Sequence, residues 1–184
     1  MALLRRVVPW RAHLALQCRL STASFKSIED EVADANVRGK GRYQVLLTKD
    51  KGWGVFADRD ISTGDLCFSA RALYTLPQRD QHSVQTSWET HTHMDLPGRF
   101  INHCCTANVG IVDNAYGAFD FIALQDLSTG DELLWDYEAS EYLSVSSFDC
   151  LCGSPRCRGR LNGFKYSGDI IKSQYGDHYA NFLK

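Results

Sequence analysis

The chain of 184 residues lacks several features that would assign it at once to a common class of protein. No run of apolar residues approaches the roughly 18 to 20 that a membrane-spanning helix needs. A net charge of -2 leaves no dense cationic face, which argues against broad nucleic-acid binding. Neither an internal repeat nor a low-complexity stretch is present. With 44% hydrophobic residues, the sequence predicts one globular domain with a sizeable core and room for a tail at either end.

Acidic residues are absent from the first 28 positions, which instead carry four arginines followed by a cluster of serine and threonine. An Arg-rich, Ser-rich and acid-poor segment is typical of an organelle transit peptide. We therefore expect residues 1–28 to direct the protein to the mitochondrion. The alternative is a disordered basic leader with no targeting role, which leaves a nuclear or cytoplasmic location. On either interpretation, the segment stays outside the fold.

The cysteines do not follow the even, spread pattern of a secreted disulfide scaffold. They number seven, and Cys150, Cys152 and Cys157 fall within eight residues of one another. This pattern favours a reduced compartment with thiolates bound to a metal. A structural zinc site takes four ligands, usually mostly thiolates, so one further ligand must come from elsewhere in the chain. The adjacent Cys104 and Cys105 are candidates for that ligand, and packing in the core is the alternative for them.

Short apolar runs separated by Gly-Asp turns predict a mainly β fold and not alternating strands and helices. Two glycines flank Trp53, and such a turn lets the backbone approach a flat or bulky group closely. We predict strands over 42–47, 66–68, 72–76, 119–124 and 132–137. We also predict a short helix or linker over 29–40, loops with a hairpin over 78–98, and a helix over 170–182.

Four segments carry recognisable motifs, and they follow one another in a fixed order along residues 40–162. They are Lys51-Gly52-Trp53-Gly54-Val55, the Arg-Phe-Ile-Asn-His-Cys-Cys run over 99–105 with its continuation to Asn108, the Gly-Asp-Glu-Leu-Leu-Trp-Asp-Tyr run over 130–137, and the Cys-x-Cys-Gly run over 150–159. Together they resemble the motifs of the SET-domain protein lysine methyltransferases. One motif alone would be weak, but four in register make a chance match improbable.

The resemblance implies a fold as well as an activity. The expected fold is a β-clip of short strands with a pseudoknot, in which one stretch threads a loop made by another. It places a SET domain at 40–138, a zinc-bound post-SET segment at 146–162 and a C-terminal tail at 163–184 that includes the predicted helix. The cysteine-rich pre-SET region of the family is absent, and the insert that shapes its substrate groove is short. These absences favour a compact methyltransferase of proteins other than histones.

The resemblance also assigns roles to individual residues. It implies that S-adenosylmethionine is the cofactor and that Tyr137 is the catalytic tyrosine. Cys104 stands where the family has serine, so we do not expect it to bind the metal. The expected cofactor-binding residues are Gly52, Trp53, Gly54, Asn102 and His103, and the expected zinc ligands are Cys105, Cys150, Cys152 and Cys157.

Trp135 departs from the family, which has Phe or Tyr at this position to tune the number of methyl groups added. Because tryptophan is larger, we predict a crowded lysine channel and lower methylation states. The favoured function is transfer of methyl groups to a lysine of a protein substrate. A non-catalytic SET-like module that binds a protein segment along a strand edge is the alternative. A zinc-stabilised nucleic-acid binder is a third interpretation, which the charge disfavours.

Overall fold

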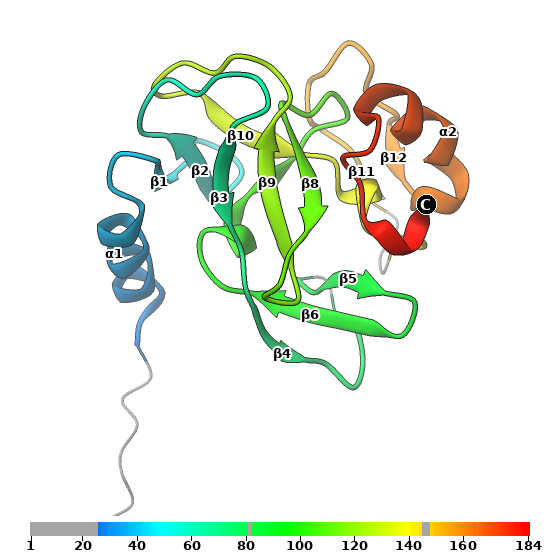
Figure 1. The fold of residues 1–184 in the computed structure, drawn as a ribbon, viewed down its shortest axis with the longest axis horizontal. Helices are drawn as coiled ribbons and strands as arrows, with labels where there is room; N and C mark the ends of the chain where they lie inside the picture. Colours follow the sequence, from blue (N-terminus) through cyan, green and yellow to red (C-terminus); the bar gives the residue numbers. More distant parts are fainter. Residues whose placement is uncertain (1–25, 81, 145–147) are drawn as a thin grey trace, which may run out of the picture.

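The computed structural model describes residues 26–80, 82–144 and 148–184, so residues 1–25 of the predicted leader lie outside it. The expectation that the whole leader stays outside the fold was wrong at its end, because Ser27 caps α1 and Ile28 is the first residue of this helix. Figure 1 shows α1 and α2 on opposite sides of a group of small sheets. The longer elements are α1 (Ile28–Gly39), β1 (Tyr43–Leu47), β2 (Trp53–Ala57), β3 (Leu66–Ser69), β4 (Ala72–Thr75), β5 (Val84–Ser87), β6 (Thr90–Met94), β8 (Val109–Asp113), β9 (Phe119–Ala123), β10 (Glu132–Trp135) and α2 (Phe164–Tyr175). The shortest are β7 (Asn102–His103), β11 (Phe148–Asp149), β12 (Arg160–Leu161) and 3-10 turns at Gly98–Phe100, Tyr137–Ala139 and Asn181–Leu183.

In the part of the chain that the structure describes, the strands form four small sheets, ordered β1-β2-β10-β7, β3-β9-β8, β4-β6-β5 and β11-β12. The predicted mainly β fold is confirmed. The strands predicted over 42–47, 66–68, 72–76 and 119–124 and the helix predicted over 29–40 are confirmed to within one residue at each end. The hairpin predicted within 78–98 is the antiparallel pair β5 and β6. Strands β2 and β8 were not predicted.

The core lies around β9, whose side chains alternate between buried and half-buried positions along the strand. Phe119 and Phe121 are fully buried, and the Phe121 ring stacks on Phe68 of β3 with centroids 4.5 Å apart. Burying an aromatic side chain of this size stabilises the fold by roughly 1.5–3 kcal/mol. The sheets therefore have an apolar core of their own.

Residues 102–108 wrap around β10 and join two of the sequence motifs. Strand β7 runs parallel to β10, with Asn102 opposite Leu134 and His103 opposite Trp135. Asn108 continues the contact, because its side chain donates to Glu132 O at 2.8 Å and accepts from the backbone of Leu134 at 2.8 Å. The two segments that the pseudoknot expectation linked are thus adjacent in space.

Helix α1 begins at a capping box, in which the Ser27 hydroxyl accepts from Asp30 N–H and the Asp30 carboxylate accepts from Ser27 N–H. It packs on the edge of the first sheet through Asn36, which exchanges hydrogen bonds with the backbone of Val45 at 2.6 and 3.1 Å. Glu31 of the same helix pairs with Arg99 at 2.5 Å. The helix is therefore tied to the segment that precedes Asn102.

Two further predicted boundaries were wrong. The C-terminal helix covers Phe164–Tyr175 and not 170–182, because its buried face begins at Phe164 and it ends at Gly176, whose φ of +58° favours glycine. The strand predicted over 132–137 ends at Trp135, so Tyr137 lies in a 3-10 turn. Among the described residues, no helix is long and apolar enough to cross a membrane.

Candidate active site and metal centre

Tyr137 leaves the end of β10 in a turn that Asp136 caps by accepting from Glu138 N–H at 3.1 Å. Its hydroxyl donates to the carbonyl of Ile101 at 3.2 Å. Its ring lies 5.1 Å from the His103 ring and 5.4 Å from the Trp135 ring. Burial, with a smaller contribution from Glu132, raises the pKa of Tyr137 to about 12. The phenol therefore stays protonated at physiological pH, with an orientation fixed by the backbone of Ile101, just before β7.

Two pockets meet at Tyr137 and Ile101, which line both of them. The first pocket is also lined by Lys51, Trp53, Phe100 and Asn102. The second pocket is a cavity of about 120 Å³ that is also lined by Asp80, Met94, Trp135 and Glu141. The structure thus brings Trp53, Asn102 and Tyr137 together, as the predicted site requires.

The wall of the first pocket is built by close contact between β2, β7 and β10. The Asn102 amide donates to Trp53 O at 3.1 Å and to Glu132 Oε1 at 2.9 Å, which leaves its oxygen as the group it can offer a ligand. A Cβ at Gly54 would lie 2.8 Å from the Thr48 side chain and 3.2 Å from the Asn102 amide, so only glycine fits there. Gly52 requires glycine for another reason, its φ of +73°.

Trp135 is buried between the core and the second pocket. Its ring lies 5.5 Å from that of Phe121, and only 3% of the residue is exposed. Its indole N–H has no hydrogen-bond partner among the described residues. The side chain thus fills the wall of the cavity next to Tyr137, as the prediction of a crowded channel requires.

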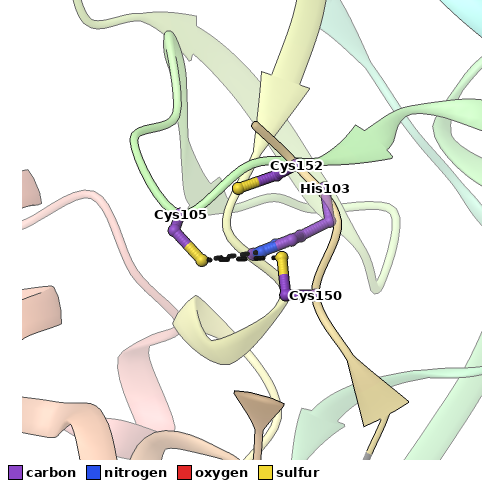
Figure 2. Close-up of side chains that lie close together, drawn as sticks. All are labelled: His103, Cys105, Cys150 and Cys152. Carbon is purple, nitrogen blue, oxygen red and sulfur yellow. Dashed lines mark hydrogen bonds between the residues drawn. The ribbon is translucent and has the colours of Figure 1, made fainter. Parts of the chain in front are cut away.

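Three of the predicted zinc ligands converge with a histidine (Figure 2). The ligand atoms of His103, Cys105, Cys150 and Cys152 all lie within 4.8 Å of one another. The three cysteines come from two distant segments: Cys105 follows β7, and the other two belong to residues 148–161, which we call the thiol segment. The sequence prediction that Cys105 joins the C-terminal cysteines therefore agrees with the geometry.

Cys157, the fourth predicted ligand, lies beside this group but not within it. Its sulfur donates to Cys150 O at 3.4 Å and accepts from Gly159 N–H at 3.4 Å. The side chain packs against the small cluster formed by Cys105, Cys150 and Leu161. Cys157 is therefore a neighbour of the group, and its sulfur is not one of the four convergent ligand atoms.

The donor set fits zinc. Tetrahedral zinc with Zn–S bonds of about 2.3 Å places two thiolate sulfurs about 3.8 Å apart. The sulfurs of Cys105 and Cys150 are 3.7 Å apart. In the metal-free chain, burial raises the pKa of Cys105 well above its usual range and that of Cys150 to about 11. Burial opposes ionisation of Cys152 too, but N–H donors from Cys105 and Ser154 lower its pKa to about 6. A divalent cation would supply the positive charge that stabilises these buried thiols in their ionised form.

His103 was expected to bind the cofactor through its backbone and side chain. The structure directs its imidazole to the thiols, with Nε2 3.3 Å from Cys105 Sγ, while Nδ1 accepts from Tyr137 N–H at 3.2 Å. Burial lowers the pKa of His103 to about 4, and nearby Asp136 only partly opposes this. The ring is therefore neutral and joins the thiols to the backbone of Tyr137.

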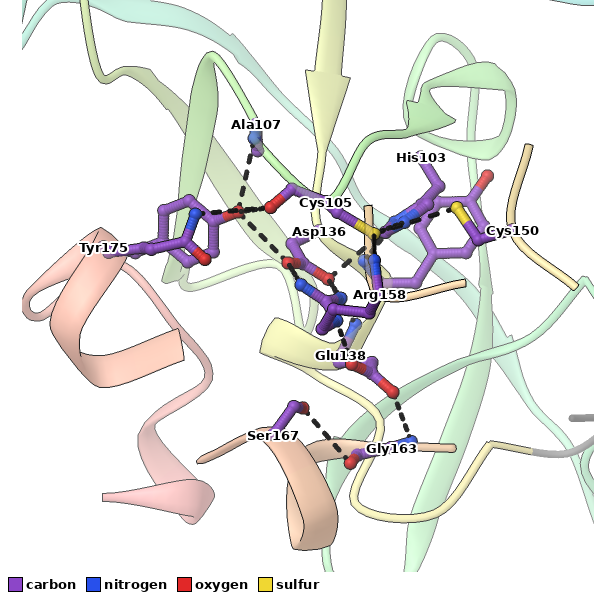
Figure 3. Close-up of polar contacts among 12 residues, drawn as sticks. His103, Cys105, Ala107, Asp136, Glu138, Cys150, Arg158, Gly163, Ser167 and Tyr175 are labelled. Atoms are coloured by element: carbon purple, nitrogen blue, oxygen red, sulfur yellow. Dashed lines mark hydrogen bonds and ion pairs between the residues drawn. The ribbon is translucent and has the colours of Figure 1, made fainter. Parts of the chain in front are cut away.

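A buried polar network supports this site, and sequence reasoning missed it (Figure 3). Arg158 of the thiol segment makes two hydrogen bonds to Asp136 at 2.6 and 2.7 Å. The Arg158 Nε atom also lies 2.8 Å from Glu138 Oε2, as an ion pair without hydrogen-bond geometry. Glu138 accepts through its other oxygen from Gly163 N–H at 2.6 Å. The two carboxylates that flank Tyr137 are thus held by the chain that carries the C-terminal cysteines.

Helix α2 joins the network through its last residue, Tyr175. The Tyr175 hydroxyl lies 3.1 Å from both Cys105 O and Asp136 Oδ2 and accepts from Ala107 N–H at 3.2 Å. Arg158 and Asp136 lie inside sequence motifs and could have been paired by their opposite charges. Nothing local marks Tyr175, because its partners are some 40 to 70 residues away.

Comparison with known proteins agrees with this architecture. Residues 52–138 match the family model described as the SET domain. This part of the chain is therefore similar to SET domains, as its motifs predicted. The methyltransferase domain of the human histone-lysine N-methyltransferase SETMAR has a similar fold, with a TM-score of 0.51 at 23% identity over 66% of this chain and 58% of that one.

Two curated relatives carry methyltransferase names. Histone-lysine N-methyltransferase ASHH2 of Arabidopsis thaliana is 36% identical over 47% of this chain. The H3 lysine-9 specific histone-lysine N-methyltransferase dim-5 of Neurospora crassa is 28% identical over 79% of it. The matched parts span 5% and 58% of these relatives' own lengths.

Proposed function

We propose that the protein is a protein-lysine N-methyltransferase that uses S-adenosylmethionine. The observation that carries this proposal is the position of Tyr137 at the junction of two pockets. One pocket contains Trp53 and Asn102, which the family motifs assign to the cofactor. A methyl group that passes between the two pockets must pass Tyr137.

The reaction asks little of the protein beyond positioning and desolvation. S-adenosylmethionine supplies an electrophilic methyl group on a sulfonium, and the nitrogen of a neutral lysine displaces it in line. Because the Tyr137 hydroxyl donates to Ile101, its lone pairs are free to face the polarised methyl group. The raised pKa of Tyr137 keeps the phenol protonated, so this donation persists during turnover.

The second pocket suits a lysine side chain. Met94, Ile101 and Trp135 provide apolar walls that lower the pKa of a buried amine toward neutrality. Asp80 and Glu141 place carboxylates in the same lining. The Glu141 Oε1 atom accepts from Gln85 N–H at 2.7 Å, and Oε2 has no hydrogen-bond partner among the described residues. The negative charge of the two carboxylates attracts a cationic lysine but also raises the pKa of its amine, so loss of the proton depends on the apolar wall.

We further propose that residues 148–161 form a post-SET zinc segment, with Cys105, Cys150, Cys152 and Cys157 as ligands. The separation of the Cys105 and Cys150 sulfurs supports this assignment. In the same proposal, residues 1–25, which precede the Ser27 cap of α1, form a mitochondrial transit peptide on the strength of their composition. The relatives carry histone names, but the short insert and the leader favour another protein as substrate.

Binding of the cofactor is the first test. A ligand present at 100 times its Kd stabilises a folded protein by about 2.7 kcal/mol, which raises the melting temperature. We expect such a rise with S-adenosylmethionine and its demethylated product. A non-catalytic interaction module would show none.

Transfer is the second test. Cofactor labelled on the methyl group, incubated with the protein and a mitochondrial extract, should label discrete protein bands on lysine. Tyr137→Phe should abolish the labelling while the rise in melting temperature persists. Equal labelling by the variant would remove Tyr137 from the mechanism, and a rise without labelling by the wild type would favour a cofactor-binding module.

A further inference from the structure

We propose that His103 is a positioning residue that connects the metal centre to the catalytic tyrosine and is not itself a metal ligand. Its Nε2–H donates to the Cys105 sulfur, and its Nδ1 holds the backbone N–H of Tyr137. This role goes beyond methyl transfer, and it can be tested without any activity measurement.

The first step is the tautomer of His103. Tyr137 N–H points to Nδ1 at 3.2 Å, so Nδ1 carries a lone pair and no proton. A proton on Nδ1 would oppose that N–H, and Asp136 Oδ1 is 3.8 Å from Nδ1, beyond hydrogen-bond distance. The backbone of Trp135 also hydrogen-bonds the ring, but the direction of the Tyr137 N–H assigns the ring proton to Nε2.

The second step concerns what Nε2 can do. A protonated nitrogen has no lone pair for a metal, so proximity to the thiols makes Nε2 a donor and not a ligand. It lies 3.3 Å from Cys105 Sγ, and the backbone N–H of Arg158 approaches the same sulfur at 3.4 Å. Two N–H donors that point at one sulfur stabilise it as a thiolate. Hydrogen bonds of this kind to a metal ligand change the affinity of the site for its metal. In this proposal the fourth ligand is Cys157, which the family resemblance assigns to the metal and whose sulfur lies beside the group.

The third step is the coupling. The imidazole is a rigid plane with only 7% of its side chain exposed. One edge contacts the thiolate and the other contacts the main chain at Tyr137, so a shift of Cys105 is transmitted to the tyrosine. The ring also packs against the Tyr137 ring, with centroids 5.1 Å apart. Zinc bound to Cys105 would thus fix the position from which the tyrosine acts.

Nuclear magnetic resonance of the 15N-histidine-labelled whole chain, loaded with 113Cd, tests the tautomer without a mutation. His178 is an internal reference, because its Nδ1 faces the carbonyl of Tyr175 at 3.1 Å and must carry a proton. We expect opposite tautomers, with Nε2–H at His103 and Nδ1–H at His178. Scalar coupling between 113Cd and His103 Nε2 would overturn the proposal.

Two variants of His103 separate its two hydrogen bonds. His103→Asn keeps an acceptor near the Nδ1 position but does not reach the sulfur, whereas His103→Gln can place an amide N–H near the Nε2 position. We expect His103→Asn to lower metal affinity by roughly 10- to 100-fold with little change in hydrogen exchange at Tyr137 N–H. His103→Gln should retain more of the metal affinity than His103→Asn does. It should also make hydrogen exchange at Tyr137 N–H faster.

The absorption spectrum of the cobalt(II) protein identifies the ligands. Both His103 variants should keep the bands of four thiolates, whereas Cys157→Ser should lose thiolate-to-cobalt intensity. His178→Gln is the control for a partly buried histidine and should change neither spectrum nor affinity. If the His103 variants alter the bands and Cys157→Ser does not, His103 is the ligand and the proposal is wrong.

Discussion

The sheets around β9 and the thiol segment both hold the 3-10 turn that carries Tyr137, but they do so by different forces. The sheets rely on apolar burial, with Phe119 and Phe121 fully enclosed and β8 paired to β9 along its length. The thiol segment buries a single aliphatic side chain, Leu161, in its own small cluster. It depends instead on cysteine sulfurs and on Arg158. Burial of apolar surface tolerates small changes, whereas a thiolate or buried carboxylate needs its particular partner.

Metal removal should have the largest effect and should divide the molecule into these two regions. Apparent binding free energies of structural zinc reach about 10 kcal/mol, and the thiol segment has little else to order it. After chelation, we expect residues 148–161 to lose protection from hydrogen exchange while β8 and β9 keep theirs. Mass spectrometry of the exchanged peptides measures both. Equal loss in both regions would show that they form one cooperative unit, and the comparison would then be wrong.

Arg158→Met should come next, because it leaves Asp136 and Glu138 buried without a counter-charge. The side chains of these two carboxylates are only 1% and 2% exposed. Breaking a buried ion pair by removing one partner costs about 3–5 kcal/mol. Chemical denaturation of the zinc-loaded protein measures this loss. Arg158→Lys is the matched control, since it keeps the charge but not the two-pronged contact, and its loss should be smaller.

The two regions also differ in how well the sequence predicted them. Strands such as β9 follow from alternating apolar residues, and the pairing of Cys105 with the later cysteines followed from a family resemblance. The imidazole of His103 was assigned to the cofactor, because its motif gives no sign of which way the ring turns. Tyr175 contacts Cys105 across 70 positions of sequence, a distance at which no local pattern operates. Contacts that a single polar atom makes with residues far away in the sequence could not be predicted, and only the structure shows them.

Phe121→Ala should destabilise the sheets without changing the metal site. Replacing a fully buried phenylalanine by alanine costs about 3–5 kcal/mol through lost burial and a residual cavity. We expect lower global stability in denaturant and an unchanged metal affinity of the folded fraction. Val112→Ala, on the neighbouring strand and 37% exposed, is the control and should stay within about 0.5 kcal/mol. Weaker metal binding by Phe121→Ala would show that the two regions are coupled.

Tyr175→Phe removes one oxygen from the junction between the regions. The ring remains, but Ala107 N–H loses its acceptor. Cys105 O and Asp136 lose the single hydroxyl proton that either can accept, but they keep Gln174 and Arg158 as donors. Leaving buried polar groups unpaired costs about 1–3 kcal/mol. The expected result is a modest loss of stability together with faster hydrogen exchange at Ala107. Tyr166→Phe, 68% exposed on the same helix, should have no measurable effect.

Trp135→Phe should change stability least and the product most, because Trp135 belongs to the sheets but also faces the second pocket. Its ring packs on Phe121 and lies 5.4 Å from Tyr137, so a smaller ring leaves space where successive methyl groups must fit. We expect the wild type to give mainly mono- and dimethyl-lysine on its labelled substrate and the variant to shift toward trimethyl-lysine, as seen by mass spectrometry. Trimethyl-lysine as the main product of the wild type would mean that Trp135 does not crowd the channel. The product distribution would then have to be set by the cavity's polar side, where the carboxylates of Asp80 and Glu141 lie.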